Sequence, residues 1–346
     1  MRIKLYVHEW PLSDQAIWAT LLKCGHPLDD KGALSHVRAS TVQPIEVGYG
    51  RWLSWLEAAD PCALGLPILD RATPERVMSW MQSMQHLAPY SRVMYLDALI
   101  WILKATHPAA DITILRRIRA VHHLEALSNN GSRKNGRILS SPILLKAGLE
   151  LAGPQANAAT STFERMRRLR DGTMLAFLAV LPLRRRAFVG LELGVSVLPG
   201  SAGIEIALPP AMTKTGIPWS AMAPDPLDNL LQRYLTEARP FLFNRGPRDH
   251  MGLWVADTGL PIGYSYMGRR IPELSEKMTG VRVPPHFFRD AAATTLARES
   301  SSASRLAAPI LGHTSIRTAE KHYNHAQCIE AGSTYAALLE RRRRNS

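Results

Sequence analysis

A polar segment, SNNGSRKNGR at residues 128–137, divides the chain into two parts whose sequence patterns differ. It combines Asn, Gly and Ser, which favour turns and irregular backbone, with three basic residues. This composition is typical of a flexible linker, and its charge favours contact with a polyanion. Because 346 residues exceed one ordinary hydrophobic core, we expect two domains joined by a basic linker at 128–140.

The part before the linker shows only helical periodicity. Four helices are predicted, beginning near Pro44, Thr73, Ser91 and Asp111. The second has the clearest start, because Thr73 can cap the helix and Pro74 suits its first position. Large apolar residues recur at helical spacing and are expected to form the core: Trp52, Trp80, Met81, Met84 and Trp101. We therefore expect an all-α bundle over 41–127, preceded by an N-terminal extension, 1–40, of unknown role.

The part after the linker has a mixed pattern. A helix is predicted at 161–181 and is followed by Pro182 and a basic turn. The stretch GIEIAL at 203–208 alternates, and with IPWSAM it predicts a small antiparallel sheet with a turn at Lys214–Gly216. Helix returns from about residue 286. The expected fold of 141–346 is a mixed α+β, mainly helical domain with a small antiparallel sheet.

The net charge and the cysteine pattern limit the kind of partner and the cellular compartment that we expect. The formal net charge of +13 makes nucleic acid the first candidate partner, although a merely basic protein remains an alternative. The three cysteines lie far apart, as expected for reduced thiols. The longest apolar run, at 174–183, is about half a membrane span. We expect a cytoplasmic, nucleoid-associated protein without a membrane segment.

Five short motifs in the second part carry arginines, histidines, lysine and tyrosine in a recognisable order. They are PLRRR at 182–186, TKTG at 213–216, PPHFFRD at 284–290, LGHTS at 311–315 and EKHYNHA at 320–326. This series resembles the successive signatures of the tyrosine recombinase (phage integrase) family. The resemblance covers the C-terminal half closely, whereas the N-terminal bundle is similar to the family's SAM-like core-binding domain only in pattern.

The resemblance implies a role for each motif. It assigns the first catalytic arginine to Arg184, the mobile lysine to Lys214, the histidine-x-x-arginine box to His286 and Arg289, the third basic position to His313, and the nucleophile to Tyr323. It also implies cleavage and rejoining of double-stranded DNA through a 3′-phosphotyrosyl intermediate, with no metal or cofactor. A homotetramer on paired sites, a mobile element and an accessory directionality factor are further expectations.

The chemistry of these residue types agrees with that assignment. Cleaving a phosphodiester without a metal requires a nucleophile, cations for the developing charge, and an acid for the leaving oxygen. Arginine binds two phosphate oxygens with one planar fork and stays charged. A tyrosine hydroxyl, with an ordinary pKa of about 10, must lose its proton during attack. His286 or a neighbouring basic group could accept that proton, and by analogy with the family Lys214 would protonate the departing 5′ oxygen.

Each motif alone has a plainer interpretation. An arginine run is usually a solvated cluster, and an HxxR pair on one helical turn is usually structural. The ordered combination favours catalysis. One departure from the family concerns the acidic residue that many members carry three positions after the first arginine, because Ala187 stands there. We expect another residue to support Arg184.

Several weaker expectations concern DNA contacts and metal. Candidate phosphate-binding residues are Arg116, Arg117, Arg119, Arg133 and Lys134. The tail AGSTYAALLERRRRNS either packs into a neighbouring protomer, as in the family, or contacts DNA. His322 and His325 flank Tyr323, but no Cys or carboxylate completes a ligand set with His313, so no metal site is expected.

Three alternative functions remain open from the sequence. The first is the same chemistry without exchange between sites, as in a type IB topoisomerase or a telomere resolvase. The second is an inactive, recombinase-derived DNA-binding regulator. The third is a structural nucleoid protein that acts through charge alone.

Overall fold

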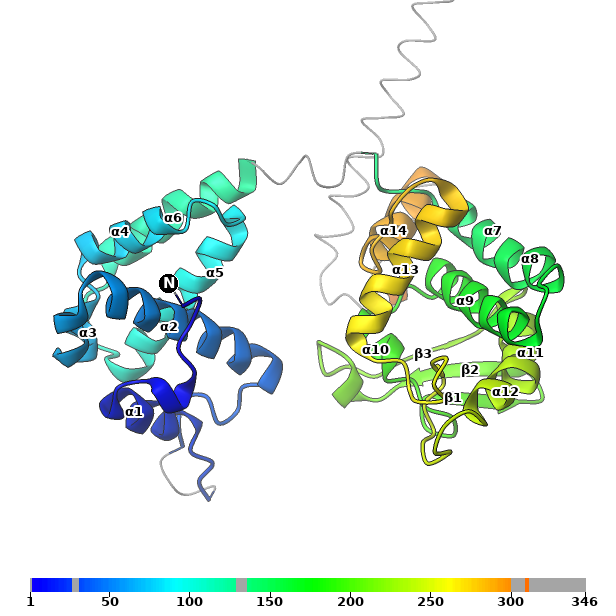
Figure 1. The fold of residues 1–346 in the computed structure, drawn as a ribbon, viewed down its shortest axis with the longest axis horizontal. Coiled ribbons are helices and arrows are strands. Elements are labelled where there is room, and N and C mark those ends of the chain that lie inside the picture. Colours follow the sequence, from blue (N-terminus) through cyan, green and yellow to red (C-terminus); the bar gives the residue numbers. More distant parts are fainter. Residues whose placement is uncertain (1, 27–30, 129–135, 300–308, 311–346) are drawn as a thin grey trace, which may run out of the picture. The chain divides into compact units, whose positions relative to one another are not determined.

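The computed structural model describes residues 2–26, 31–128, 136–299 and 309–310 (Figure 1). The chain forms two compact units, Met1–Arg133 and Lys134–Ser346, and each is described by itself. Within the described residues, no helix is both long and apolar enough to cross a lipid bilayer.

The described part of the N-terminal unit is helical. Its helices are α1 (Leu12–Leu22), α2 (Ala39–Ala59), α3 (Ile68–Arg71), α4 (Pro74–Ser83), α5 (Pro89–Thr106) and α6 (Thr113–Ser128), with 3-10 turns at Val7–Glu9 and Pro61–Gly65. The predicted start of α4 is confirmed, because the Thr73 hydroxyl accepts a hydrogen bond from the Arg76 amide at 3.3 Å. The predicted start of α2 is wrong, since this helix begins before Pro44 and contains it.

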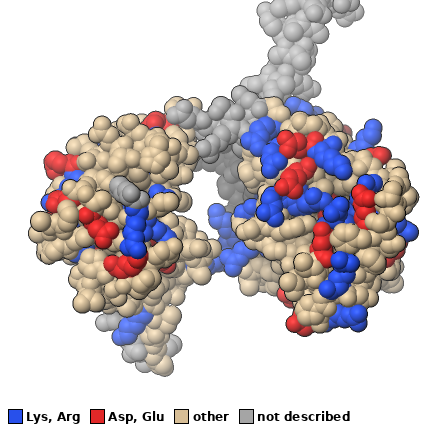
Figure 2. All heavy atoms as spheres, in the orientation of Figure 1, with Lys and Arg blue, Asp and Glu red and all other residues tan. Residues whose placement is uncertain are grey.

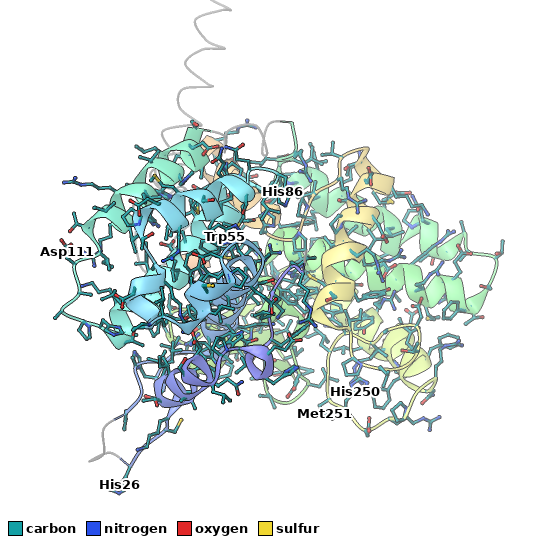
Figure 3. All side chains as sticks on the ribbon, turned by 60° about the vertical axis from the view of Figure 1, so that its left-hand side comes forward. His26, Trp55, His86, Asp111, His250 and Met251 are labelled. Carbon is teal, nitrogen blue, oxygen red and sulfur yellow. The ribbon has the colours of Figure 1, made fainter. Side chains whose placement is uncertain are left out.

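Aromatic side chains fill the core of this unit. Trp52 is fully buried, stacks on Trp55 with ring centroids 5.4 Å apart, and meets the edge of Trp80 at 5.1 Å. Figure 3 labels Trp55 among the helices of this unit. Trp80, Met81 and Met84 are buried too, and Trp101 is partly buried against the same cluster, so the predicted core is confirmed.

Residues before position 40 belong to this core. Leu5, Trp10, Trp18, Leu21 and Leu34 are buried in the same hydrophobic cluster as α2, α4 and α5. A buried ion pair adds a polar link, because Nη1 of Arg71 in α3 donates to both carboxylate oxygens of Asp14 in α1 at 2.8 Å. The Tyr49 hydroxyl of α2 donates to the same carboxylate at 2.6 Å. The N-terminal segment therefore packs as part of the helical unit.

The C-terminal unit combines helices with one sheet. Its helices are α7 (Ser141–Ala152), α8 (Pro154–Asn157), α9 (Thr162–Val180), α10 (Arg185–Val189), α11 (Leu227–Arg233), α12 (Arg239–Phe243), α13 (Tyr264–Thr279) and α14 (Phe287–Glu299), with a π-helical turn at Tyr234–Ala238 and a 3-10 turn at Pro210–Met212. Its strands are β1 (Val197–Gly200), β2 (Gly203–Leu208) and β3 (Trp219–Met222). The mainly helical α+β architecture with a small antiparallel sheet was predicted from the sequence.

The sheet has the order β1-β2-β3, and both pairings are antiparallel. The predicted pairing of 203–208 with IPWSAM is confirmed, with Leu208 opposite Trp219 and Glu205 opposite Met222. In the β2–β3 connection, Gly216 has φ 72°, a backbone conformation that favours glycine. β1 was not predicted. This connection brings Thr213 and Thr215 beside the cavity described below.

Helix α9 is the centre of the second core and carries residues 174–180 of the apolar run at 174–183. It contacts α7, α8, α11, α12, α13 and α14, and Figure 1 shows it lying along α7. The closest approach is at Gly172, where a Cβ would lie 2.4 Å from the Ala152 amide nitrogen of α7. α9 ends at Val180, and the chain then continues through Pro182 to Arg184 at the N-terminal cap of α10. The buried helix α9 thus leads directly into the first arginine motif.

Candidate functional site

A cavity of about 280 Å³ lies in the C-terminal unit beside the β2–β3 connection. Its polar groups come from two arginines and two threonines, and its other walls are largely apolar. The lining residues are Leu183, Arg184, Ala187, Leu208, Met212, Thr213, Thr215, Ile217, Pro218, Trp219, Arg289, Pro309 and Ile310. The first arginine of PLRRR and the arginine of PPHFFRD therefore share one pocket.

Arg184 reaches the cavity from the N-cap position of α10. Its carbonyl accepts a hydrogen bond from the Phe188 amide at 3.0 Å, and Phe188 is fully buried. The Phe188 ring stacks on Trp254 with centroids 4.8 Å apart. The backbone of Arg184 is therefore attached to the aromatic core, while its side chain is partly exposed toward the cavity.

Arg289 reaches the same cavity from the first turn of α14. Its Nη1 donates to the Pro182 carbonyl at 2.8 Å. Pro182 lies two residues before Arg184, so this hydrogen bond connects the two arginine motifs directly. The connection fixes the spacing of the segments that carry the two guanidinium groups.

The surroundings of Arg184 and Arg289 lower the pKa of both side chains. Burial, and after it the charge of Arg184, lowers the pKa of Arg289 to about 10, against an opposing effect of Asp290. Burial also lowers the pKa of Arg184. Among the described residues, the Arg184 guanidinium has no carboxylate or hydrogen-bond partner. Two partly buried positive groups in a cavity favour an anion between them, because the anion offsets both desolvation and repulsion.

Lys214 and His286 do not line this cavity. Lys214 is exposed in the predicted β2–β3 connection, between the lining residues Thr213 and Thr215. His286 is exposed just before α14, and its ring packs edge-on against Phe287 at 4.5 Å. His286 directly precedes α14, which begins at Phe287, and the His286 carbonyl accepts a hydrogen bond from the Arg289 amide at 3.3 Å.

The other candidate residues are placed as follows. His313, Tyr323, His322 and His325, the C-terminal tail, Arg133 and Lys134 lie outside the described residues. Arg116 and Arg117 are exposed on α6, which begins after the labelled Asp111 in Figure 3. Arg119 instead pairs with Asp97 of α5, with Nε donating at 2.8 Å and Nη2 at 3.1 Å. It is therefore less available to a phosphate than Arg116 or Arg117.

The sequence did not single out Trp219 as a site residue. Its indole Nε1 donates to the Pro309 carbonyl at 2.9 Å, and both residues line the cavity. This hydrogen bond attaches residue 309, two positions before the LGHTS motif, to the sheet. The only sequence signal was a tryptophan in the alternating stretch IPWSAM, where an apolar strand residue is the ordinary interpretation.

Comparison with known proteins identifies a shared fold. No protein-family model and no curated protein matches the sequence. Among solved structures, a Tn1549 transposon integrase in complex with transposon right end DNA matches with a TM-score of 0.57 and 13% identity, over 94% of this chain and 98% of that chain. The XerH site-specific recombinase bound to difH substrate matches with a TM-score of 0.54 and 15% identity, over 93% and 94%.

These structural neighbours are tyrosine recombinases and integrases. The largely helical architecture with its three-stranded antiparallel sheet is the integrase-like fold. At this level of identity the comparison establishes the fold, and the chemistry of the site has to be argued from the chain's own residues.

Proposed function

We propose that this chain is a site-specific DNA recombinase that cleaves and rejoins DNA strands through Tyr323. The observation that carries the proposal is the cavity shared by Arg184 and Arg289, in which burial and mutual repulsion lower the pKa of Arg289 to about 10. A phosphodiester supplies the anion that such a pair favours. The fold shared with a transposon integrase and a site-specific recombinase, both solved with DNA, supports DNA as the substrate.

In the proposed reaction, the two guanidinium groups hold the non-bridging oxygens of the scissile phosphate. The Tyr323 phenol transfers its proton to a base, for which His286 is the candidate, and its oxygen attacks the phosphorus. The bond to the 5′ oxygen breaks, and Lys214 gives that oxygen a proton. His313 donates a hydrogen bond to the phosphoryl group.

The covalent product is a 3′-phosphotyrosyl linkage, which keeps the energy of the phosphodiester. A 5′ hydroxyl from another strand can then attack the phosphorus, release the tyrosine and restore a phosphodiester without a nucleotide cofactor. In this proposal residues 141–346 catalyse the reaction, residues 41–127 bind DNA as the core-binding domain, and a homotetramer assembles on paired sites. We also propose that the recombinase acts for a mobile element.

A suicide substrate tests the proposal. Nicked duplexes made from the DNA that flanks the gene are incubated with the full chain, and covalent adducts are detected on denaturing gels. We expect an adduct with the wild type and with Tyr335→Phe, a tyrosine of the C-terminal tail, and none with Tyr323→Phe. An adduct formed equally by Tyr323→Phe would assign the nucleophile elsewhere.

The same assay separates the alternatives. DNA binding by the wild type without any adduct favours the inactive DNA-binding regulator. Relaxation of supercoiled plasmid that lacks the flanking DNA favours a topoisomerase-like enzyme. An adduct confined to the flanking DNA, followed by strand exchange between two sites, supports the recombinase.

A further inference from the structure

Arg185, the residue next to Arg184, packs against helix α13. Its guanidinium carbon lies 3.4 Å from the centroid of the Tyr264 ring, within the range of a cation–π contact. A Cβ built on Gly268 would lie only 2.1 Å from Nη1 of Arg185. Tyr264 and Gly268 are four residues apart and share one face of α13. The guanidinium therefore occupies a site formed by an aromatic ring and a bare glycine.

This contact bears on the position of Arg184. α10 spans only Arg185–Val189, and a helix of that length depends on tertiary contacts for its position. Phe188 attaches it to the aromatic core through Trp254, and Arg185 attaches its first residue to α13. Arg184, as the N-cap residue, directly precedes that attachment. Movement of Arg185 would therefore shift the adjoining backbone from which the Arg184 side chain enters the cavity.

Helix α13 is itself firmly held. Nε of Arg270 donates to a carboxylate oxygen of Asp171 in α9 at 3.0 Å, and Asp171 is buried. The fully buried Arg170 donates to the other oxygen of the same carboxylate at 2.7 Å. α13 thus offers Arg185 a support that is fixed to the central helix of the unit.

We propose that Arg185, held by Tyr264 and Gly268, is a positioning residue that orients Arg184 toward the phosphate. The inference rests on the proposed function of Arg184. It accounts for the alanine at position 187, where many members of the family that the sequence resembles carry an acidic residue, because no carboxylate contacts Arg184 in the described part of the chain. Support through the neighbouring arginine and α13 replaces support through an acid.

Gly268→Ala is the most informative variant. The new methyl group should displace the Arg185 guanidinium. The helix itself should not be weakened, because alanine favours helix more than glycine does. We expect the melting temperature to stay unchanged or rise, and DNA affinity to stay within about threefold. The rate constant for cleavage of the suicide substrate should fall by about 10- to 100-fold, the cost of a small misplacement of a catalytic group. A purely structural role for Gly268 would leave that rate constant unchanged.

Tyr264 gives a matched pair. Tyr264→Ala removes the ring and should slow cleavage as Gly268→Ala does, whereas Tyr264→Phe keeps the ring and should cleave at the wild-type rate. Phe163→Ala is the control, because it removes another cation–π contact of this unit, with Arg245 at 4.6 Å. The control should leave cleavage unchanged. Cleavage at the wild-type rate by both Gly268→Ala and Tyr264→Ala overturns the inference. A loss of DNA affinity as large as the loss of cleavage rate also overturns it, because Arg185 would then be a DNA contact.

A second measurement does not depend on cleavage. Orthovanadate mimics a phosphoryl group, and its affinity for the full chain can be measured by calorimetry. We expect Gly268→Ala and Tyr264→Ala to weaken this binding about tenfold, and Tyr264→Phe to leave it unchanged. If the wild type binds vanadate but forms no adduct with DNA, the proposed function fails and the vanadate affinities alone decide the inference. If the wild type does not bind vanadate, the inference fails too.

Discussion

At the scale of single residues, the cavity holds two arginine side chains at a cost in stability. Arg184 and Arg289 are both partly desolvated, and the charge of Arg184 disfavours the charged form of Arg289. The Pro182 carbonyl offsets part of that cost at Arg289. The described structure gives no carboxylate to Arg184. Groups held in this way are more stable with an anion bound than without one.

Replacement of Arg184 should separate stability from activity. Arg184→Met removes one cation but keeps an unbranched side chain in the apolar wall. We expect the free energy of unfolding to stay unchanged or to rise by up to about 1 kcal/mol, since the repulsion with Arg289 is lost. Cleavage of the suicide substrate should fall below detection. Urea denaturation with and without phosphate measures the first effect, and phosphate should stabilise the wild type more than the variant.

A clear loss of stability in Arg184→Met would contradict this account. It would mean that Arg184 serves the fold through contacts other than an anion site. Arg186→Met is the control, because Arg186 is exposed on the same short helix and does not line the cavity. Neither its stability nor its response to phosphate should change.

At the scale of secondary-structure elements, the buried pair of Asp14 and Arg71 connects α1 to α3. Both side chains are almost fully buried, with exposed fractions of 0% and 3%. Asp14→Ala leaves the Arg71 charge buried without its partner, which should lower the free energy of unfolding by about 3–5 kcal/mol. Asp60→Ala breaks the more exposed pair with Arg76 and should cost about 0–1 kcal/mol.

Tryptophan fluorescence can follow this unfolding. Six of the eight tryptophans precede residue 128, so the signal reports mainly on the N-terminal unit. Similar costs for Asp14→Ala and Asp60→Ala would show that α1 adds little to the stability of this unit. A large difference would establish the segment before residue 40 as an integral part of the helical bundle.

Local sequence signals predicted some elements and missed others for physical reasons. The start of α4 was predictable because Thr73 and Pro74 determine it within one turn. α13 was missed because it contains Gly268 and Pro272, both unfavourable in a helix. The packing of α1 was missed because it depends on the ion pair between Asp14 and Arg71. These residues are 57 positions apart in the sequence, and helical periodicity gives no signal over that distance.

The candidate site was predictable to a similar extent. The arginine motifs were recognisable locally, and the fold brings Arg184 and Arg289 to one cavity. The contribution of Trp219 and the packing of Arg185 on Tyr264 depend on contacts between distant segments. The same is true of Arg119, whose partner Asp97 lies on another helix.

At the scale of the whole molecule, the net charge of +13 does not form a uniform surface. On the face drawn in Figure 2, Lys and Arg are interspersed with Asp and Glu in the C-terminal unit. Many cations are engaged in ion pairs, including Arg165 with Glu237 and Arg282 with Glu276. Contacts to DNA phosphates should therefore depend on particular exposed cations, and total charge is a poor guide to them.

The salt dependence of DNA binding tests this view on one helix. Arg116 and Arg117 are exposed on α6, whereas Arg119 on the same helix is engaged with Asp97. Each phosphate contact that is lost should reduce the slope of log affinity against log salt by about 0.9. We expect Arg116→Gln with Arg117→Gln to reduce the slope by about 1–2, measured by fluorescence anisotropy on a labelled duplex between about 50 and 200 mM salt. Arg119→Gln is the control: it should keep the wild-type slope and lose up to about 1 kcal/mol of folding free energy. An unchanged slope in the double variant would place the DNA contacts on other cations.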